Sequence, residues 1–183
     1  MSSRDAHESR EAGTGASAAQ TEHDLPGRAE SERRVTQEVD RAQRYRHPLS
    51  VATMELDPLP PAMAPRNVEP GGMFAHFVRR VRAVQRDCDV LSHWSADVVL
   101  WILPETELDA AVLACERLRR ALAGAAPGNS PPLTISVGVA ELEPGEEGAS
   151  LLKRAHDAFL ISQARGRNCV TRADVLPRPD SAA

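Results

Sequence analysis

Arginine is the most prominent residue type with binding chemistry in this chain. Of its 22 basic side chains, Lys153 is the single lysine and the other 21 are arginines. A guanidinium group presents several N–H donors in a planar fork, which suits bidentate binding of a phosphate or of the guanine Hoogsteen edge. A GC-rich genome enriches arginine as well. Only arginines at defined positions relative to other motifs can therefore support a binding function.

Histidine and cysteine spacing predicts neither a metal centre nor a disulfide framework. The six histidines show no metal-ligand spacing with one another or with Cys88, Cys115 and Cys169. Three cysteines cannot all pair, which indicates a protein of the reducing cytoplasm. The sequence contains no P-loop, no Rossmann glycine pattern and no serine–histidine–aspartate arrangement that spacing supports. We therefore expect a cytoplasmic protein without a cofactor.

The composition leaves room for one domain with an aliphatic core. The chain has 183 residues, of which 42% are hydrophobic, 26% are charged and only 3% are aromatic. No uninterrupted apolar stretch approaches the roughly 18 residues of a membrane helix, and the polar N-terminus lacks the apolar segment of a secretory signal. The net charge of −4 weighs against a broad nucleic-acid surface, which needs a basic face. We expect neither a membrane nor a nucleic acid among its partners.

Hydrophobic periodicity divides the chain into a central domain and two tails. Residues 1–30 have no hydrophobic period and predict a disordered N-terminal tail, whereas residues 174–183 predict a flexible C-terminal one. Between them, residues 31–173 alternate helical and strand patterns, which predicts an α/β fold on a mixed sheet. The expected elements are a helix from about 31 to before Pro48, a strand at 49–56, a proline-rich loop at 58–72, a helix from Phe74 to Val84, a strand from Val90, a strand at 98–103, a helix at 106–122, a strand at 133–140, a helix at 152–162 and a strand at 168–171.

Local patterns predict how these elements pack and end. The unbroken apolar run 98–103 is typical of a strand covered on both faces. In strand 133–140 one face carries small residues and the other branched aliphatic ones. Thr106 and Asp109 are spaced as in a capping box, so we expect the Thr106 hydroxyl to cap the following helix. Gly166 is expected to end the last helix.

Several segments resemble the GGDEF domains, whose active members are diguanylate cyclases. The similarity extends over residues 33–173 at consistent spacing. It implies a nucleotide-cyclase-like palm of the α+β class, with a central, mostly antiparallel five-stranded sheet flanked by helices. The matching segments are residues 133–140 (LTISVGVA, resembling TISIGVA), 151–158 (resembling LLKRADEAL), 164–168 (resembling AKxxGRN), 102–106 (resembling LPxT) and 115–119 (resembling AERIR).

The signature that names the family is replaced in this chain. The resemblance places the GGDEF pentapeptide on residues 95–99, which read SADVV. Ser95 and Ala96 stand where two glycines allow the hairpin backbone to approach a phosphate. Val98 stands where active members carry a metal-binding carboxylate, and a valine cannot coordinate a cation. Glu55 occupies the position of the other metal-binding carboxylate.

Two further departures point away from catalysis. The FKxxND segment of the family is replaced by the proline-rich residues 59–65, and its phosphate-facing lysine corresponds to Gln163, although Arg167 remains. Magnesium that activates a triphosphate is held by carboxylates together with phosphate oxygens. The comparison with the family therefore implies a protein without cyclase activity, catalytic residues or a metal site.

The resemblance also implies a second site, the product-inhibition site at which many GGDEF domains bind cyclic di-GMP. Its core in those domains is an RxxD motif five residues before the signature, with a further arginine from the next helix. Arg86 and Asp89 match the motif here, and Arg117 matches the further arginine. RxxD also occurs elsewhere in this chain, at Arg154 and Asp157, so the joint position of the three residues carries the prediction. The alternative is a surface ion-pair cluster without function.

These observations leave three hypotheses for the function. The first is a catalytically inactive cyclic di-GMP receptor or signalling adaptor, which acts through a protein partner or by ligand-bridged dimerisation. The second is a protein–protein interaction module that kept the fold and binds no ligand. The third is an atypical diguanylate cyclase that uses Glu55 and Asp97.

Overall fold

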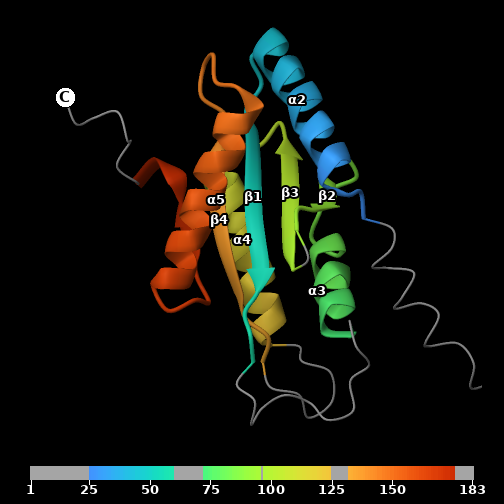
Figure 1. The fold of residues 1–183 in the computed structure, drawn as a ribbon, viewed down its shortest axis with the longest axis vertical. Coiled ribbons are helices and arrows are strands. Elements are labelled where there is room, and N and C mark those ends of the chain that lie inside the picture. Colours follow the sequence, from blue (N-terminus) through green and yellow to red (C-terminus); the bar gives the residue numbers. More distant parts are fainter. Residues whose placement is uncertain (1–24, 60–71, 96, 125–131, 176–183) are drawn as a thin grey trace, which may run out of the picture.

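The computed structural model describes residues 25–59, 72–95, 97–124 and 132–175, which form one sheet with helices on both sides (Figure 1). The strand order is β2-β3-β1-β4-β5; β4 and β5 are parallel, and all other neighbours are antiparallel. This arrangement confirms the predicted α+β fold with a mostly antiparallel five-stranded sheet. The elements are α2 (Arg28–Tyr45), β1 (Leu49–Leu56), α3 (Gly72–Arg82), β2 (Val90–His93), β3 (Val98–Pro104), α4 (Leu108–Ala123), β4 (Ile135–Glu141), α5 (Gly148–Ala164), β5 (Val170–Arg172) and the 3-10 helix η2 (Ala173–Val175).

Strand β3, between β2 and the central β1, contacts both layers of helices. α3 and α4 cover one face of the sheet, and α2 and α5 cover the other. Trp101 packs into the core on the α3/α4 side, whereas Leu100 and Ile102 pack into the core on the α2/α5 side. Every residue of β3 is buried, which confirms that the apolar run is a strand covered on both faces.

The small-residue face of β4 allows α5 to lie directly against the sheet. A Cβ atom built on Gly138 would stand 2.1 Å from the Phe159 nitrogen and 2.2 Å from the Ala155 oxygen. Both are main-chain atoms of α5, so a flexible side chain cannot move aside to make room. Glycine is therefore needed for close packing of α5, the helix that carries Gln163 towards the end of β1.

The predicted capping box before α4 is wrong. The N-cap residue of α4 is Glu107, and its side chain makes no capping hydrogen bond. The Thr106 hydroxyl instead donates to the Pro104 carbonyl at 2.8 Å. The Leu108 N–H donates to Glu141 Oε2 at 2.7 Å, so a carboxylate of β4 caps the helix from a distant part of the chain. Local sequence spacing cannot reveal a partner 33 residues away.

The folded region extends beyond both predicted domain boundaries. α2 begins at Arg28 and Leu25 is buried in the core, so the predicted boundary at residue 31 is too late. At the other end, residues 174 and 175 belong to η2. The predicted tails otherwise lie outside the described residues, at 1–24 and 176–183. No helix in the described ranges is long and apolar enough to cross a membrane.

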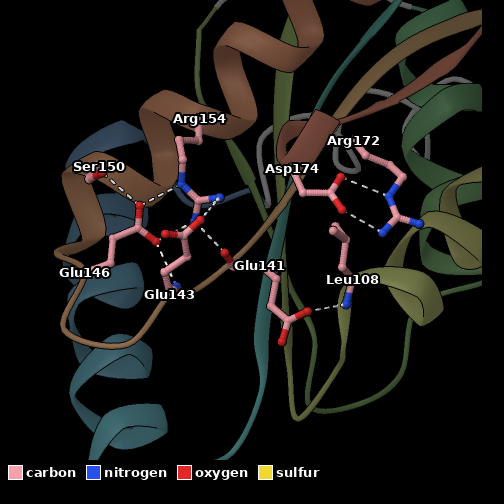
Figure 2. A network of polar contacts seen from close by, with 8 residues as sticks. All are labelled: Leu108, Glu141, Glu143, Glu146, Ser150, Arg154, Arg172 and Asp174. Carbon is pink, nitrogen blue, oxygen red and sulfur yellow. Dashed lines mark hydrogen bonds and ion pairs between the residues drawn. The ribbon is translucent and has the colours of Figure 1, made fainter. Parts of the chain in front are cut away.

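Arg154 anchors α5 to the loop that follows β4. Its Nε donates to Glu146 Oε1 at 2.8 Å, and its guanidinium also bonds the Glu141 carbonyl and pairs with Glu143 at 3.4 Å (Figure 2). The Ser150 hydroxyl donates to the same Glu146 oxygen at 2.8 Å. Burial opposes ionisation of Glu146, but the hydrogen bonds from Arg154, from the Glu143 N–H and from Ser150 outweigh it and lower its pKa below the ordinary 4.5.

Arg154→Met is expected to lower the free energy of unfolding by about 1–3 kcal/mol, because Glu146 loses a charged hydrogen-bond donor. The lowered pKa means that the stability from Glu146 is fully present above its ordinary pKa and is lost as the pH falls through the lowered one. Urea denaturation at a series of acidic pH values should therefore show a smaller pH dependence in the variant than in the native chain.

Lys153→Met is the matched control for this prediction. Lys153, the residue before Arg154 on the same helix, forms an exposed ion pair with Asp157 four residues further on. Its loss should change the free energy of unfolding by less than about 0.5 kcal/mol. Equal destabilisation by both variants, or an unchanged pH dependence in Arg154→Met, would contradict the anchoring role of Arg154.

Candidate functional site

The hairpin between β2 and β3 lies at the residues to which the GGDEF resemblance assigns the signature. The N–H groups of Trp94 and Ser95 both donate to the Val98 carbonyl, at 2.9 and 3.2 Å. Ser95 is exposed at this turn, and residue 96 lies outside the described ranges. His93 is the last residue of β2, as predicted for a strand residue, and its ring stacks on Phe74 at 5.0 Å.

Glu55 and Val98 are directly paired neighbours in the β1–β3 ladder. Val98 is 9% exposed, and its hydrocarbon side chain occupies the position beside Glu55 that a second carboxylate would need. Glu55 Oε2 instead accepts a hydrogen bond from Gln163 Nε2 of α5 at 2.9 Å. Position 98 therefore contributes no carboxylate oxygen beside Glu55.

Burial and two neighbouring acids raise the pKa of Glu55. Desolvation is the largest cause, Asp97 and Asp57 add repulsion, and Gln163 and Arg167 partly oppose the shift. Because the folded state holds this proton more tightly, the contribution of Glu55 to stability decreases as the pH rises through its raised pKa. Within the described ranges, no group of three or more histidine, cysteine or acidic residues is arranged to hold a metal ion.

Asp57, which the sequence analysis did not single out, organises the turn after α5. The side chain is 6% exposed; Oδ1 accepts from the Ser136 hydroxyl at 2.6 Å and Oδ2 from the Asn168 N–H at 3.0 Å. Arg167 and Asn168 both have positive φ, 65° and 49°, an uncommon conformation for residues with a Cβ. Asp57 thus holds Arg167 near Glu55. The position of Asp57 directly after a buried strand is the sequence signal that could have indicated this role.

The last helix ends as the sequence predicts. Gly166 follows the C-cap residue Arg165 and has φ of 103°, a conformation in which glycine carries no Cβ penalty. The Arg167 N–H then returns to the Ser162 carbonyl at 3.0 Å. The prediction that Gly166 ends the helix is confirmed.

Residues 86–89, called the RxxD turn here, join α3 to β2. The Arg86 N–H donates to Asp89 Oδ2 at 2.9 Å, and the Asp89 N–H donates back to the Arg86 carbonyl at 3.1 Å. Trp101 Nε1 also donates to Asp89 Oδ2, at 3.1 Å. Asp89 is 8% exposed, so its carboxylate is both desolvated and held in a defined orientation. The sequence analysis missed Trp101, because nothing local connects it to Asp89, which lies in the turn before the neighbouring strand β2.

Arg86 and Arg117 are both exposed, and neither forms an ion pair with another described residue. Glu116, beside Arg117 in the sequence, pairs instead with Arg119 and Arg120. The two arginines belong to the same side of the sheet, since Arg86 follows α3 and Arg117 lies on α4. The ion-pair cluster considered as the alternative is not formed among the described residues, and both guanidinium groups are open to an external anion.

Two hollows lie elsewhere on the described surface. One of about 920 Å³ lies between the C-terminal end of α2, the start of α4 and the β4–α5 loop. Another of about 710 Å³ lies between α2, α5 and the hairpin residues Trp94 and Ser95. Neither is lined by Arg86, Asp89 or Arg117.

Comparison with known proteins relates both the sequence and the fold to one family. The GGDEF domain of DgcB from Caulobacter crescentus, solved with c-di-GMP, superimposes with a TM-score of 0.74 at 20% identity, covering 94% of this chain and 99% of that one. Diguanylate cyclase SiaD from Pseudomonas aeruginosa, solved with its activator SiaC, gives a TM-score of 0.71 at 26% identity, covering 81% of this chain and 58% of that one.

Curated relatives agree with the structural neighbours. Diguanylate cyclase DgcM of Escherichia coli K12 is 33% identical over 97 residues, which are 53% of this chain and 24% of DgcM. Diguanylate cyclase DgcP of Pseudomonas aeruginosa is 29% identical over 153 residues, 79% of this chain and 22% of DgcP. The chain thus spans about a quarter of the length of these relatives. The family profile described as "Diguanylate cyclase, GGDEF domain" matches residues 69–169, and the chain belongs to the GGDEF domain family.

Proposed function

We propose that this chain is a receptor for cyclic di-GMP that binds the dinucleotide through Arg86, Asp89 and Arg117 and does not synthesise it. One observation carries the proposal: two exposed arginines without ion-pair partners lie on the same side of the sheet as a carboxylate fixed in the RxxD turn. The guanidinium forks suit the phosphates and the guanine Hoogsteen edge, and the carboxylate suits the N–H donors of guanine.

Relatives with the same fold support this choice of ligand. The GGDEF domain of DgcB was solved in complex with c-di-GMP, and another solved structure describes the interaction of a microbial GGDEF domain with the same dinucleotide. The acidic net charge of −4 does not oppose such a ligand, because a small dianion needs a few placed cations rather than a broad basic face.

The hairpin supports the second half of the proposal, the absence of cyclase activity. The signature is degenerate: Ser95 and Ala96 replace its glycines, and Val98 replaces its carboxylate. The acid that remains, Glu55, has a raised pKa and pairs with Gln163 instead of a second acid. Loss of the carboxylate at position 98 weakens both the binding of magnesium and the neutralisation of a triphosphate.

The proposed response passes to a second molecule. The exposed guanidinium groups of Arg86 and Arg117 suit a dianion held between two copies of the chain, which would form a ligand-bridged homodimer. A protein partner that recognises the liganded surface is the other route, and SiaD, with its activator SiaC, is a relative solved with a partner protein. Sedimentation of the chain with and without cyclic di-GMP separates these routes, since only the first doubles the mass without another protein.

Calorimetric titration of the full chain tests the proposal. We expect cyclic di-GMP to bind with measurable heat at micromolar protein, and cyclic di-AMP to bind much more weakly. Adenine presents an acceptor at N1 where guanine presents an N–H, so the Asp89 carboxylate would face an acceptor. In the same preparation, GTP and Mg²⁺ should yield no cyclic di-GMP on chromatography.

Each half of the proposal can fail separately. Absence of heat with cyclic di-GMP would refute the receptor function and leave the hypothesis of a ligand-free interaction module. Product formation from GTP, lost on Glu55→Gln, would establish the atypical cyclase instead. Equal affinity for the guanine and adenine dinucleotides would refute the role assigned to Asp89.

A further inference from the structure

Trp101 connects the buried core to the RxxD turn. It is the largest of the fully buried side chains, 1% exposed, and its ring packs into the core on the α3/α4 side. Its Nε1–H donates to Asp89 Oδ2 at 3.1 Å. A buried indole N–H without an acceptor is costly, so this hydrogen bond fixes the ring and the carboxylate together.

The two oxygens of Asp89 lie in different environments. Oδ2 accepts two N–H donors, the Arg86 main chain and the Trp101 indole. Two donors use both lone pairs of one carboxylate oxygen. Among the described residues Oδ1 receives no N–H donor and contacts only the Cys88 thiol, with Sγ at 3.8 Å. Oδ1 is therefore the oxygen with acceptor capacity left for a ligand.

We propose that Trp101 is a positioning residue of the cyclic di-GMP site, which holds Asp89 Oδ2 so that Oδ1 is presented to the guanine N–H donors. The inference rests on the proposed function and adds a residue that does not touch the ligand. The same Oδ2 atom bonds the Arg86 main chain, so the indole steadies the turn from which the Arg86 guanidinium extends. An acceptor ordered before binding reduces the side-chain entropy lost in the complex.

A purely structural role for Trp101 leads to a different expectation. Lost packing weakens folding but leaves the affinity of the folded chain unchanged, whereas a lost N–H donor weakens the affinity itself. Trp101→Phe keeps an aromatic ring in the core, removes the N–H donor and makes the buried side chain smaller. Leu103→Val is the matched control, because it trims a buried side chain on the same face of β3 and removes no hydrogen bond to the turn.

Calorimetry at a temperature where all variants are folded measures the effect of each substitution on the affinity for cyclic di-GMP. Trp101→Phe should bind cyclic di-GMP about tenfold more weakly than the native chain, which corresponds to the loss of one hydrogen bond to a charged group. Leu103→Val should bind within about twofold of the native chain, although it unfolds at a lower denaturant concentration.

Tryptophan fluorescence provides a readout that does not depend on Trp101→Phe folding. The chain has two tryptophans, so Trp94→Phe leaves Trp101 as the only one. Saturating cyclic di-GMP should change the emission of Trp101, because guanine donors at Oδ1 alter the charge on the carboxylate that the indole bonds. Adding Asp89→Ala should abolish this change.

The outcomes of these experiments test the positioning role of Trp101 separately from the proposed receptor function. If the native chain binds and Trp101→Phe binds equally well, the positioning role is wrong and the receptor function stands. If the native chain does not bind cyclic di-GMP, both are wrong, since no ligand remains to be positioned. If Trp101→Phe does not fold, the Trp94→Phe emission decides: a ligand-dependent change supports the inference, and an unchanged spectrum overturns it.

Discussion

Gly138→Val is expected to prevent stable folding, and Gly138→Ala should lower the free energy of unfolding by about 3 kcal/mol or more. A Cβ at this position would lie 2.1 Å from the Phe159 nitrogen and 2.2 Å from the Ala155 oxygen, so the whole of α5 would have to move away from β4. That movement would also displace Gln163 from Glu55. Urea denaturation of Gly138→Ala, followed by circular dichroism, measures the loss.

Gly124→Ala is the control for this prediction. Gly124 is the C-cap of α4 with φ of −91°, and a Cβ there would meet only the Arg120 carbonyl at 3.7 Å. We expect a change within about 0.5 kcal/mol. A Gly138→Ala variant as stable as Gly124→Ala would show that β4 and α5 can separate at little cost, and would contradict the packing argument.

Arg86→Ala and Arg117→Ala should each weaken cyclic di-GMP binding by about 10- to 100-fold, the largest functional effects expected from single substitutions. Each removes charge-assisted hydrogen bonds to the dinucleotide, which are worth about 1.5–3 kcal/mol. Arg86→Lys should restore only part of the affinity, because an ammonium group keeps the charge and lacks the planar fork. Calorimetric titration of each variant measures the change.

Arg82→Ala controls for the loss of one positive charge. Arg82 is exposed at the end of α3, near the RxxD turn in the sequence but outside the proposed contacts. Its replacement should leave the affinity within about twofold if binding depends on placed guanidinium groups rather than on overall charge. Three alanine variants with the same modest loss would indicate non-specific attraction and refute the assigned site.

Hydrophobic periodicity predicted the helices and strands well, because the period of each element is determined by which of its own residues are buried. The apolar run of β3 required cover on both faces, and the small-residue face of β4 required a close neighbour. Both requirements are met by the helices on the two sides of the sheet. The order of the elements, and the position of Gly166 at the end of α5, follow from the same local rules.

Hydrophobic patterns did not predict the interactions between distant parts of the chain. The cap of α4 comes from Glu141 rather than Thr106, and the turn after α5 depends on Asp57. In each case a carboxylate, part-buried in Glu141 and buried in Asp57, accepts a main-chain N–H that lies far away in the sequence. Hydrogen-bonding capacity can be read from residue types, but the choice of partner depends on which strands and helices become neighbours.

The sequence by itself determined the order of helices and strands through its hydrophobic period, because that period is a local property. The resemblance of its segments to the GGDEF domains implied the five-stranded α+β sheet and assigned the residue types at the signature and RxxD positions. Only the tertiary structure decided that Val98 lies directly beside Glu55, that Arg86 and Arg117 carry no ion pair within the described ranges, and that Trp101 binds Asp89. These facts depend on strand register and on desolvation, both of which arise when separate segments pack against one another.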